Sequence, residues 1–152
     1  MVMSERRAEV SRRFGTRPER IFAAFASADL VARWLSPAPE IALQVLAYDF
    51  RIHGNYRFAY RVPNGQTMHV HGSFHEIVAP THLVFSWLIE APDEHAGVDS
   101  EVRVSIASAP GGAILTIVHE RLDRPGALER HAAGWAGALD RLQSLLSVAV
   151  VR

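Results

Sequence analysis

The chain has 152 residues, and its sixteen basic and sixteen acidic side chains cancel to a net charge of zero. Without a positive excess or a basic run, we expect no nucleic-acid partner and no membrane partner. Lysine and cysteine are both absent, which excludes a Schiff-base lysine, a thiol nucleophile and a disulfide. No apolar run approaches the roughly 18 residues of a membrane span, so we expect a single cytoplasmic domain over residues 1–152.

The first third of the chain predicts one strand and two short helices. Residues 8–14 alternate between apolar and polar side chains, as a strand does. Thr16 followed three residues later by Glu19 matches a capping box, which predicts a short helix through residues 18–25. Ser27 predicts the cap of a second short helix, and Pro37 stops it.

A period of two dominates the middle of the chain and predicts six further strands. Their expected ranges are 41–51, 56–62, 68–78, 82–90, 102–106 and 114–119. The sequence Pro63-Asn64-Gly65 suits a hairpin turn, because Asn and Gly tolerate positive φ. Residues 91–99 are polar, and we expect them to form a mobile loop.

The last segment, residues 125–150, predicts a long amphipathic helix. Its apolar side chains recur at steps of three and four and share one stripe: Leu128, Ala132, Trp135, Leu139, Leu142, Leu146 and Ala149. At about 1.5 Å per residue the helix would run roughly 35 Å, enough to span a small core. The sequence therefore predicts an α+β fold, in which one helix cannot fill the concave side of a curved antiparallel sheet and a gap remains.

Aromatic side chains are the candidates for lining that gap. Buried rings offer a large contact area, and Tyr or Trp adds a directional hydrogen-bond donor. The residues concerned are Trp34, Tyr56, Phe58, Tyr60, Phe85, Trp87 and Trp135. The alternative for each is ordinary core packing, and for Trp34 a plug against the sheet.

Four polar residues interrupt apolar strands, namely Asp49, Arg51, Glu90 and His119. A buried ionisable group is costly unless it is paired, so an inward-facing Arg51 or His119 would anchor a ligand or act as a general acid or base. His119 continues the inward series of its strand. The alternative is a surface charge or a cross-strand pair. The sequence has none of the common hydrolase, kinase or dehydrogenase motifs.

Three histidines, His69, His71 and His75, share one face of the predicted strand 68–78. Imidazoles at this spacing can share a metal ion. Val70 and Phe74 have the stronger claim to the inner face, so we interpret the histidine face as solvated and expect no metal and no cofactor.

The outer face of the last predicted strand carries Ile114 and Val118, and is more apolar than contact with solvent requires. A self-association surface would explain this pattern, so a homodimer is a second possible partnership.

Short motifs in order resemble one known family, the activator-of-heat-shock-protein-90-ATPase homologues. They are Arg33-Trp34, the segments 49–54, 72–77, 83–87 and 115–120, and Gly134-Trp135 with Leu139 and Leu142. The resemblance covers about residues 8–146. It implies a START-like helix-grip fold, with a curved antiparallel sheet of about seven strands around a long C-terminal helix, two short helices after the first strand, and a hydrophobic cavity. One departure is His53-Gly54, where the family usually has Gly-Gly.

The resemblance implies binding of a small apolar or aromatic ligand in that cavity. Two alternatives stay open: an interaction module that acts on a chaperone ATPase, and a cyclase or dehydratase that uses the same cavity. Whether the protein is an enzyme is left open. The candidate cavity residues are Trp34, Arg51, Tyr56, Phe58, Tyr60, Phe85, Trp87, His119, Trp135 and Leu139.

Overall fold

The structure, a computed structural model, describes residues 7–151 and the side chains of residues 7–147. Within these residues the chain forms seven strands and three helices. In chain order they are β1 (Ala8–Phe14), α1 (Pro18–Ala26), α2 (Ala28–Trp34), β2 (Ala42–Tyr48), β3 (Asn55–Arg61), β4 (Thr67–Val78), β5 (His82–Ile89), β6 (Ser100–Ala109), β7 (Gly112–Glu120) and α3 (Ala127–Val151).

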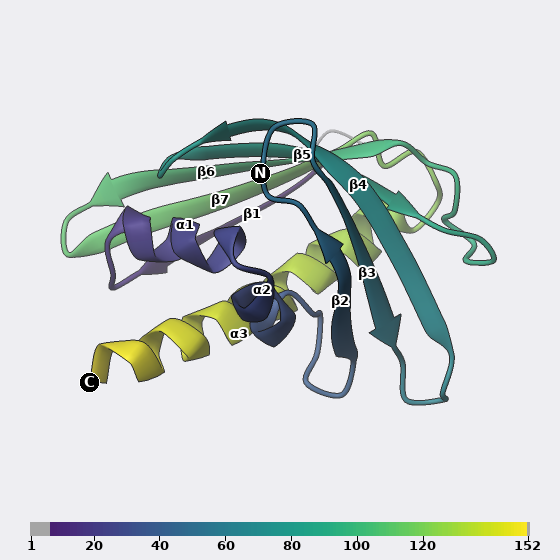
Figure 1. Cartoon of the computed structure of the whole chain (residues 1–152), viewed down its shortest axis with the longest axis horizontal. Helices are drawn as coiled ribbons and strands as arrows, with labels where there is room; N and C mark the ends of the chain where they lie inside the picture. Colours follow the sequence, from purple (N-terminus) through teal and green to yellow (C-terminus); the bar gives the residue numbers. More distant parts are fainter. Residues whose placement is uncertain (1–6, 152) are drawn as a thin grey trace.

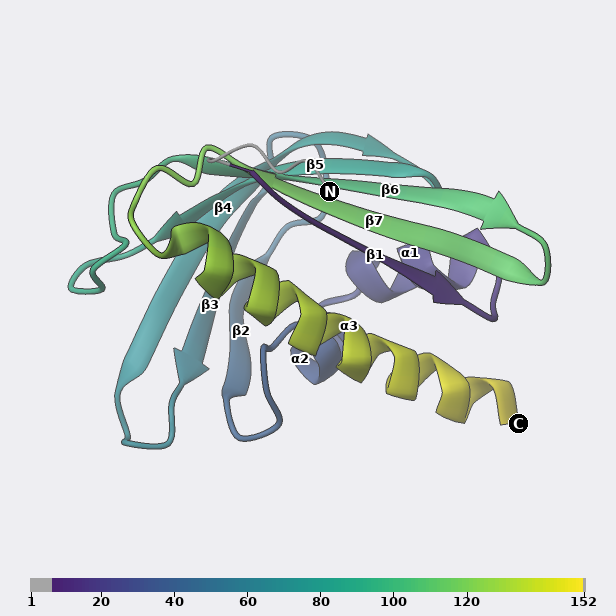
Figure 2. The same ribbon diagram turned by 180° about the vertical axis from the view of Figure 1, so that it is seen from behind.

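The strands form one sheet in the order β1-β7-β6-β5-β4-β3-β2, and every neighbouring pair is antiparallel. The sheet curves strongly, and α3 crosses its concave side (Figure 1). Helices α1 and α2 lie on the same side, beside the C-terminal half of α3 (Figure 2). This is the helix-grip arrangement that the resemblance implied.

The inward faces of the strands follow the period of two predicted from sequence. On β5 the side chains of Leu83, Phe85 and Ile89 are buried in the core, and β7 buries Leu115 and Ile117 completely. Burial of such large apolar side chains stabilises the fold by roughly 1.5–3 kcal/mol each. The sheet therefore presents a continuous apolar inner face to the helices.

Helix α3 begins at Ala127, two residues later than the predicted start at Pro125. Gly126 has φ +81°, a left-handed conformation that ends the preceding loop rather than beginning a helix. The predicted stripe is confirmed from Trp135 to Leu146, whose side chains join the main core. The first two residues of the stripe, Leu128 and Ala132, pack against a smaller apolar cluster instead. Ala149 lies outside the described side chains.

The predicted capping box at the start of α1 is wrong. The N-cap is Arg17, without a side-chain cap, and Pro18 occupies the first turn. Thr16 instead accepts a hydrogen bond from Arg20. At α2 the prediction is confirmed, because the Ser27 hydroxyl accepts from the backbone N–H of Leu30.

The loop of residues 91–99, expected to be mobile, is held by arginines from the segment after β7. Arg124 donates to the carbonyl oxygens of Glu94 and Ala96, at 2.8 and 3.0 Å. Arg121 donates to the Asp99 carbonyl at 3.0 Å. The loop is therefore tethered beside the start of α3.

At His53-Gly54, where the family usually has Gly-Gly, the structure shows what each position requires. His53 adopts φ 69°, the left-handed region that favours glycine. A Cβ atom on Gly54 would lie 2.0 Å from the Asp49 carbonyl oxygen, so that glycine is needed for close backbone contact. The chain thus keeps the glycine that the packing requires and accepts strain at the residue before it.

None of the described helices combines the length and the apolar character needed to cross a membrane.

Candidate functional site: an apolar cavity under the C-terminal helix

An apolar cavity of about 490 Å³ lies between the N-terminal half of α3 and the open end of the sheet. Its walls come from α3, the ends of β3, β4 and β5, and the segment between α2 and β2. The lining residues are Leu35, Ser36, Pro37, Ile41, Tyr60, Val62, Met68, Trp87, Ile89, Arg130, His131, Ala133, Gly134, Trp135 and Ala138. This volume lies within the range of small-molecule sites, about 300–1,000 Å³.

Close backbone packing positions the wall that faces α3. A Cβ atom on Gly137 would lie 1.9 Å from the Pro37 carbonyl oxygen, so no side chain fits there. Gly134, one turn earlier, has Pro37 Cβ at 3.8 Å from a built Cβ, an ordinary contact distance. The glycine at 137 therefore lets the α2–β2 segment lie directly against the helix and close one side of the cavity.

Three aromatic residues belong to the lining, namely Tyr60, Trp87 and Trp135. The two indole rings are 5.5 Å apart, tilted by 52°. The Tyr60 hydroxyl donates to the Leu35 carbonyl at 3.0 Å, and burial raises the pKa of Tyr60, which keeps it a neutral donor. That hydrogen bond ties β3 to the α2–β2 segment and fixes the shape of the wall.

His119 lies directly behind this wall and is fully buried, with 0% of its surface exposed. Its Nδ1 accepts from Trp135 Nε1 at 3.0 Å. Ser100 donates its own proton to the Trp87 carbonyl at 2.6 Å, so the 2.8 Å contact of His119 Nε2 with Ser100 Oγ has the imidazole as donor. Burial lowers the pKa of His119 well below 6.5, and nearby His131 lowers it further. His119 is a neutral residue that orients Trp135.

The placement of His119 corrects its candidate role as a ligand anchor or general acid or base. Both ring nitrogens are bonded within the protein, and His119 is absent from the cavity lining. The prediction that His119 faces inward is confirmed. The Trp135 side chain, however, lies between His119 and the cavity.

His131, on α3, is the histidine that lines the cavity. Its Nδ1 lies 2.8 Å from the Ala127 carbonyl oxygen, which fixes Nδ1 as the protonated nitrogen. Burial lowers the pKa of His131, so the ring is neutral near pH 7 and Nε2 carries a lone pair. The His131 and His119 ring centroids are 4.6 Å apart, in an edge-to-face arrangement.

A bidentate ion pair stands at the rim of the cavity. Arg130 donates to the two carboxylate oxygens of Asp93 at 2.8 and 2.9 Å, and to Met68 Sδ at 3.0 Å. The hydrogen bonds from Arg130 lower the pKa of Asp93 to about 2. The pair joins α3 to the loop of residues 91–99, and the Arg130 charge is already neutralised by a partner.

Of the ten predicted cavity residues, Tyr60, Trp87 and Trp135 line the cavity. Five others are packed into the core: Trp34, Tyr56, Phe58, Phe85 and Leu139. Trp34 fits the plug alternative, because it is fully buried and its Nε1 donates to the Ala24 carbonyl at 3.0 Å. Tyr56 donates to the Ser86 carbonyl at 2.6 Å, with Gly72 leaving room for its ring.

Arg51 lies outside the cavity, which corrects its candidate role as a ligand anchor. Its side chain is 76% exposed and pairs with Asp49 at 2.7 Å. Strand β2 ends at Tyr48, so Arg51 belongs to the following turn rather than to an inward strand face. Glu90 also lies on the outer side, where Arg57 and His71 contact its carboxylate at 2.9–3.0 Å. The surface-pair alternative holds for both.

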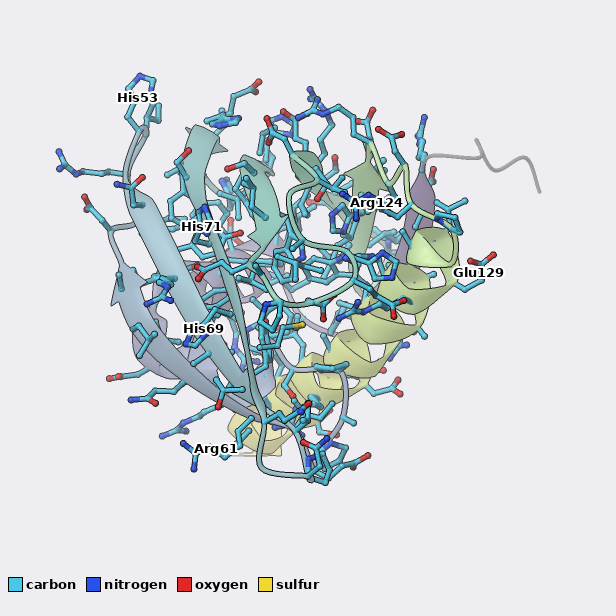
Figure 3. All side chains as sticks on the ribbon, turned by 90° about the vertical axis from the view of Figure 1, so that its right-hand side faces the viewer. His53, Arg61, His69, His71, Arg124 and Glu129 are labelled. Carbon is cyan, nitrogen blue, oxygen red and sulfur yellow. The ribbon has the colours of Figure 1, made fainter. Side chains whose placement is uncertain are left out.

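The histidines of β4 lie on the outer face of the sheet, as their alternation predicts. His69 and His71 follow one another along the strand, away from α3 (Figure 3). His71 contacts Glu90 at 2.9 Å, and His75 lies 3.7 Å from Glu101. Within the described part of the chain, no group of three His, Cys, Asp or Glu side chains is placed to hold a metal ion.

A second depression, of about 650 Å³, lies on the opposite side of the Pro37 segment. Although its volume is larger, its lining includes the exposed charged residues Arg33, Glu40 and Asp140 and the half-buried Arg141. Water already fills such a surface groove favourably, so the apolar cavity under α3 is the better candidate site.

Sequence reasoning missed the lining residues on α3 and on the segments that flank the sheet. Arg130, His131 and Ala138 lie on the helix, and Ser36 and Ile41 on the α2–β2 segment. One signal was present: Gly134 and Gly137 interrupt a long helix, which indicates close approach of another segment.

Fold and site together define a helix-grip protein with an apolar cavity between its sheet and its C-terminal helix. The family model described as Activator of Hsp90 ATPase homolog 1-like protein matches residues 15–147, and the chain belongs to this family.

Solved structures of similar proteins share the whole fold. Protein CV1439 from Chromobacterium violaceum is 25% identical, with a TM-score of 0.83 over 93% of this chain and 97% of that one. The AHSA1 protein from Silicibacter pomeroyi is 23% identical, with a TM-score of 0.81 over 94% and 99%. A protein from Rhodobacter sphaeroides is 22% identical, with a TM-score of 0.81 over 97% of each chain. The comparison with curated proteins gave no match.

Proposed function

We propose that the protein binds a small apolar or aromatic molecule in the cavity under α3. The observation that carries the proposal is a space of about 490 Å³ walled by Tyr60, Trp87 and Trp135. Aromatic and aliphatic walls favour a ligand that gains contact area on leaving water.

The supporting geometry is a cavity whose walls are already fixed by the protein. Tyr60 and Trp135 are each held by a hydrogen bond, to Leu35 and His119 respectively. A ligand would therefore lose little affinity to ordering of these side chains on binding.

The exposed surface gives the chaperone-partner alternative less support. The large exposed apolar side chains of the described residues are Leu46, Ile52, Val78 and Ile114, which lie on four different segments. Apolar residues scattered singly are normal on a protein surface, whereas an interaction site needs a contiguous patch. The homodimer suggested by Ile114 stays a prediction, and light scattering that gives a monomer mass at all concentrations would remove it.

The first experiment is native mass spectrometry of the protein as purified, followed by denaturing extraction of any released small molecule. A retained apolar compound supports ligand binding and identifies a scaffold. If the protein is empty and its unfolding temperature ignores a library of lipids and aromatic compounds, the proposal fails. A chaperone ATPase assay then becomes the next measurement.

A cavity-filling substitution tests where the ligand binds. Ala138 is 3% exposed and lines the cavity, so Ala138→Leu places three additional carbon atoms in that space. We expect at least tenfold weaker ligand binding without loss of stability. The matched control is Ala136→Leu, on the same helix and outside the cavity lining. Equal binding by the two variants would place the ligand elsewhere.

A further inference from the structure

The polar groups of the cavity wall are nearly all committed to partners in the protein. Tyr60 donates to Leu35, Trp135 donates to His119, and Arg130 donates twice to Asp93. A ligand that bonded to one of these donors would first have to break its existing hydrogen bond. The free energy lost with the old bond would about equal the free energy gained from the new one.

His131 is different, because half of its imidazole is uncommitted. Its Nδ1–H donates to Ala127, and among residues 7–147 no donor contacts Nε2. The residue is 9% exposed and belongs to the cavity lining. A ligand that supplies a donor can therefore bond this nitrogen in place of the water that would otherwise hydrate it.

A second unpartnered group belongs to the same wall. Trp87 Nε1 is buried and has no hydrogen-bond partner. Because Trp87 Nε1 is fully buried, a ligand in the cavity meets only the His131 acceptor, and a hydroxyl group supplies the donor that this acceptor lacks. A carboxylate would instead direct its lone pairs at the lone pair of His131 Nε2.

On the basis of the proposed function, we infer that the cavity selects a neutral, hydroxyl-bearing aromatic molecule, whose hydroxyl donates a hydrogen bond to His131 Nε2 while its rings pack against Trp87 and Trp135. His131 is then the residue that determines specificity, and the aromatic walls supply most of the contact area. The rim arginine is excluded as the anchor for a charged ligand because Asp93 already occupies it.

The test compares 2-naphthol with 2-methoxynaphthalene by equilibrium dialysis. The two probes share a ring system, and methylation removes only the donated hydrogen. We expect the parent protein to bind 2-naphthol about tenfold more tightly, as about 1.4 kcal/mol of hydrogen-bond energy predicts. In His131→Phe the preference should fall to below twofold, while affinity for 2-methoxynaphthalene changes little. Since glutamine offers an acceptor oxygen, His131→Gln should restore part of the preference.

A measurement on the unmodified protein covers the case in which these variants do not fold. In ¹⁵N-labelled protein the His131 Nε2 signal should shift on addition of 2-naphthol and stay in place with 2-methoxynaphthalene. Equal affinity of the parent protein for the two probes, a preference that survives His131→Phe, or an unmoved Nε2 signal at saturation with 2-naphthol would each overturn the inference and leave the proposed function standing. If neither probe binds, ligand binding itself fails and this inference fails with it.

Discussion

Replacing His119 by glutamine should make the protein less sensitive to mild acid. Burial lowers the pKa of His119 well below 6.5, so the folded chain holds this imidazole neutral while the unfolded chain protonates it freely. The free energy of unfolding is therefore fully retained above about pH 6.5. It decreases as the pH falls from there towards the folded-state pKa, because the unfolded state binds the additional proton.

The magnitude follows from linkage. A histidine that stays neutral in the folded state removes up to about 1.4 kcal/mol of stability per pH unit below its unfolded pKa. Against a typical total of about 5–15 kcal/mol, one such group is measurable. Glutamine retains both hydrogen bonds of the neutral ring, accepting from Trp135 through its oxygen and donating to Ser100 through its nitrogen. His119→Gln should therefore remove the pH slope while keeping the contacts.

The assay is urea denaturation at pH 7, 6 and 5. This window stays above the range in which Glu90 and Asp93, both with pKa lowered to about 2, begin to lose their stabilising charge. Between pH 6 and 5 the parent protein should lose about 1 kcal/mol more than His119→Gln. The control, His69→Gln on the outer face, should keep the parental slope. Parallel slopes for the parent and His119→Gln would refute the reasoning. His131, the titratable neighbour of His119, is present in all three proteins.

Two further substitutions test the packing that shapes the cavity, and a third tests backbone strain at His53, outside the cavity lining. Gly137→Ala should lower the unfolding free energy by about 2 kcal/mol, because its Cβ would lie 1.9 Å from the Pro37 carbonyl oxygen; the control Gly134→Ala has only a 3.8 Å contact and should raise it by up to about 1 kcal/mol through helix propensity. Equal effects in urea denaturation would contradict the packing argument. Tyr60→Phe should cost about 1 kcal/mol through loss of the hydrogen bond to the α2–β2 segment, and an unchanged midpoint would count against it. His53→Gly should stabilise by about 0.5 kcal/mol, since relief of a strained φ of 69° outweighs the entropy of glycine; a lower midpoint would show that the strain is absent.

The sheet could be predicted from sequence because most of its strands bury one face more than the other. A period of two leaves little freedom in which residues point inward, and Leu115, Ile117 and His119 on β7 follow it. Where a β-bulge breaks the period, the prediction weakens. The register of β2 against β3 shifts between Val45 and Ala47, and Leu46 between them is exposed.

Alternation could not predict which inward residues border the cavity. Tyr56 and Tyr60 share one face of β3, yet Tyr56 is covered by Gly72 and Ser86 while Tyr60 lies at the open end. That difference depends on where α3 and the Pro37 segment stop covering the sheet. It is a property of tertiary packing, and no local pattern encodes it.

The two histidines under α3 show how the same desolvation serves stability and recognition differently. Behind the wall, both ring nitrogens of His119 are hydrogen-bonded within the protein, Nδ1 to Trp135 and Nε2 to Ser100, so its neutral form serves packing alone. In the wall, only the Nδ1 atom of His131 is hydrogen-bonded within the protein, to the Ala127 carbonyl. The neutral ring therefore keeps a lone pair on Nε2, on the side of the ring away from the helix backbone. Burial that destabilises the fold in mild acid thus keeps a neutral acceptor at the cavity near pH 7. Below the lowered pKa of His131, protonation of Nε2 would remove that acceptor and weaken binding of a hydroxylated ligand, whereas the fold already begins to lose stability below about pH 6.5.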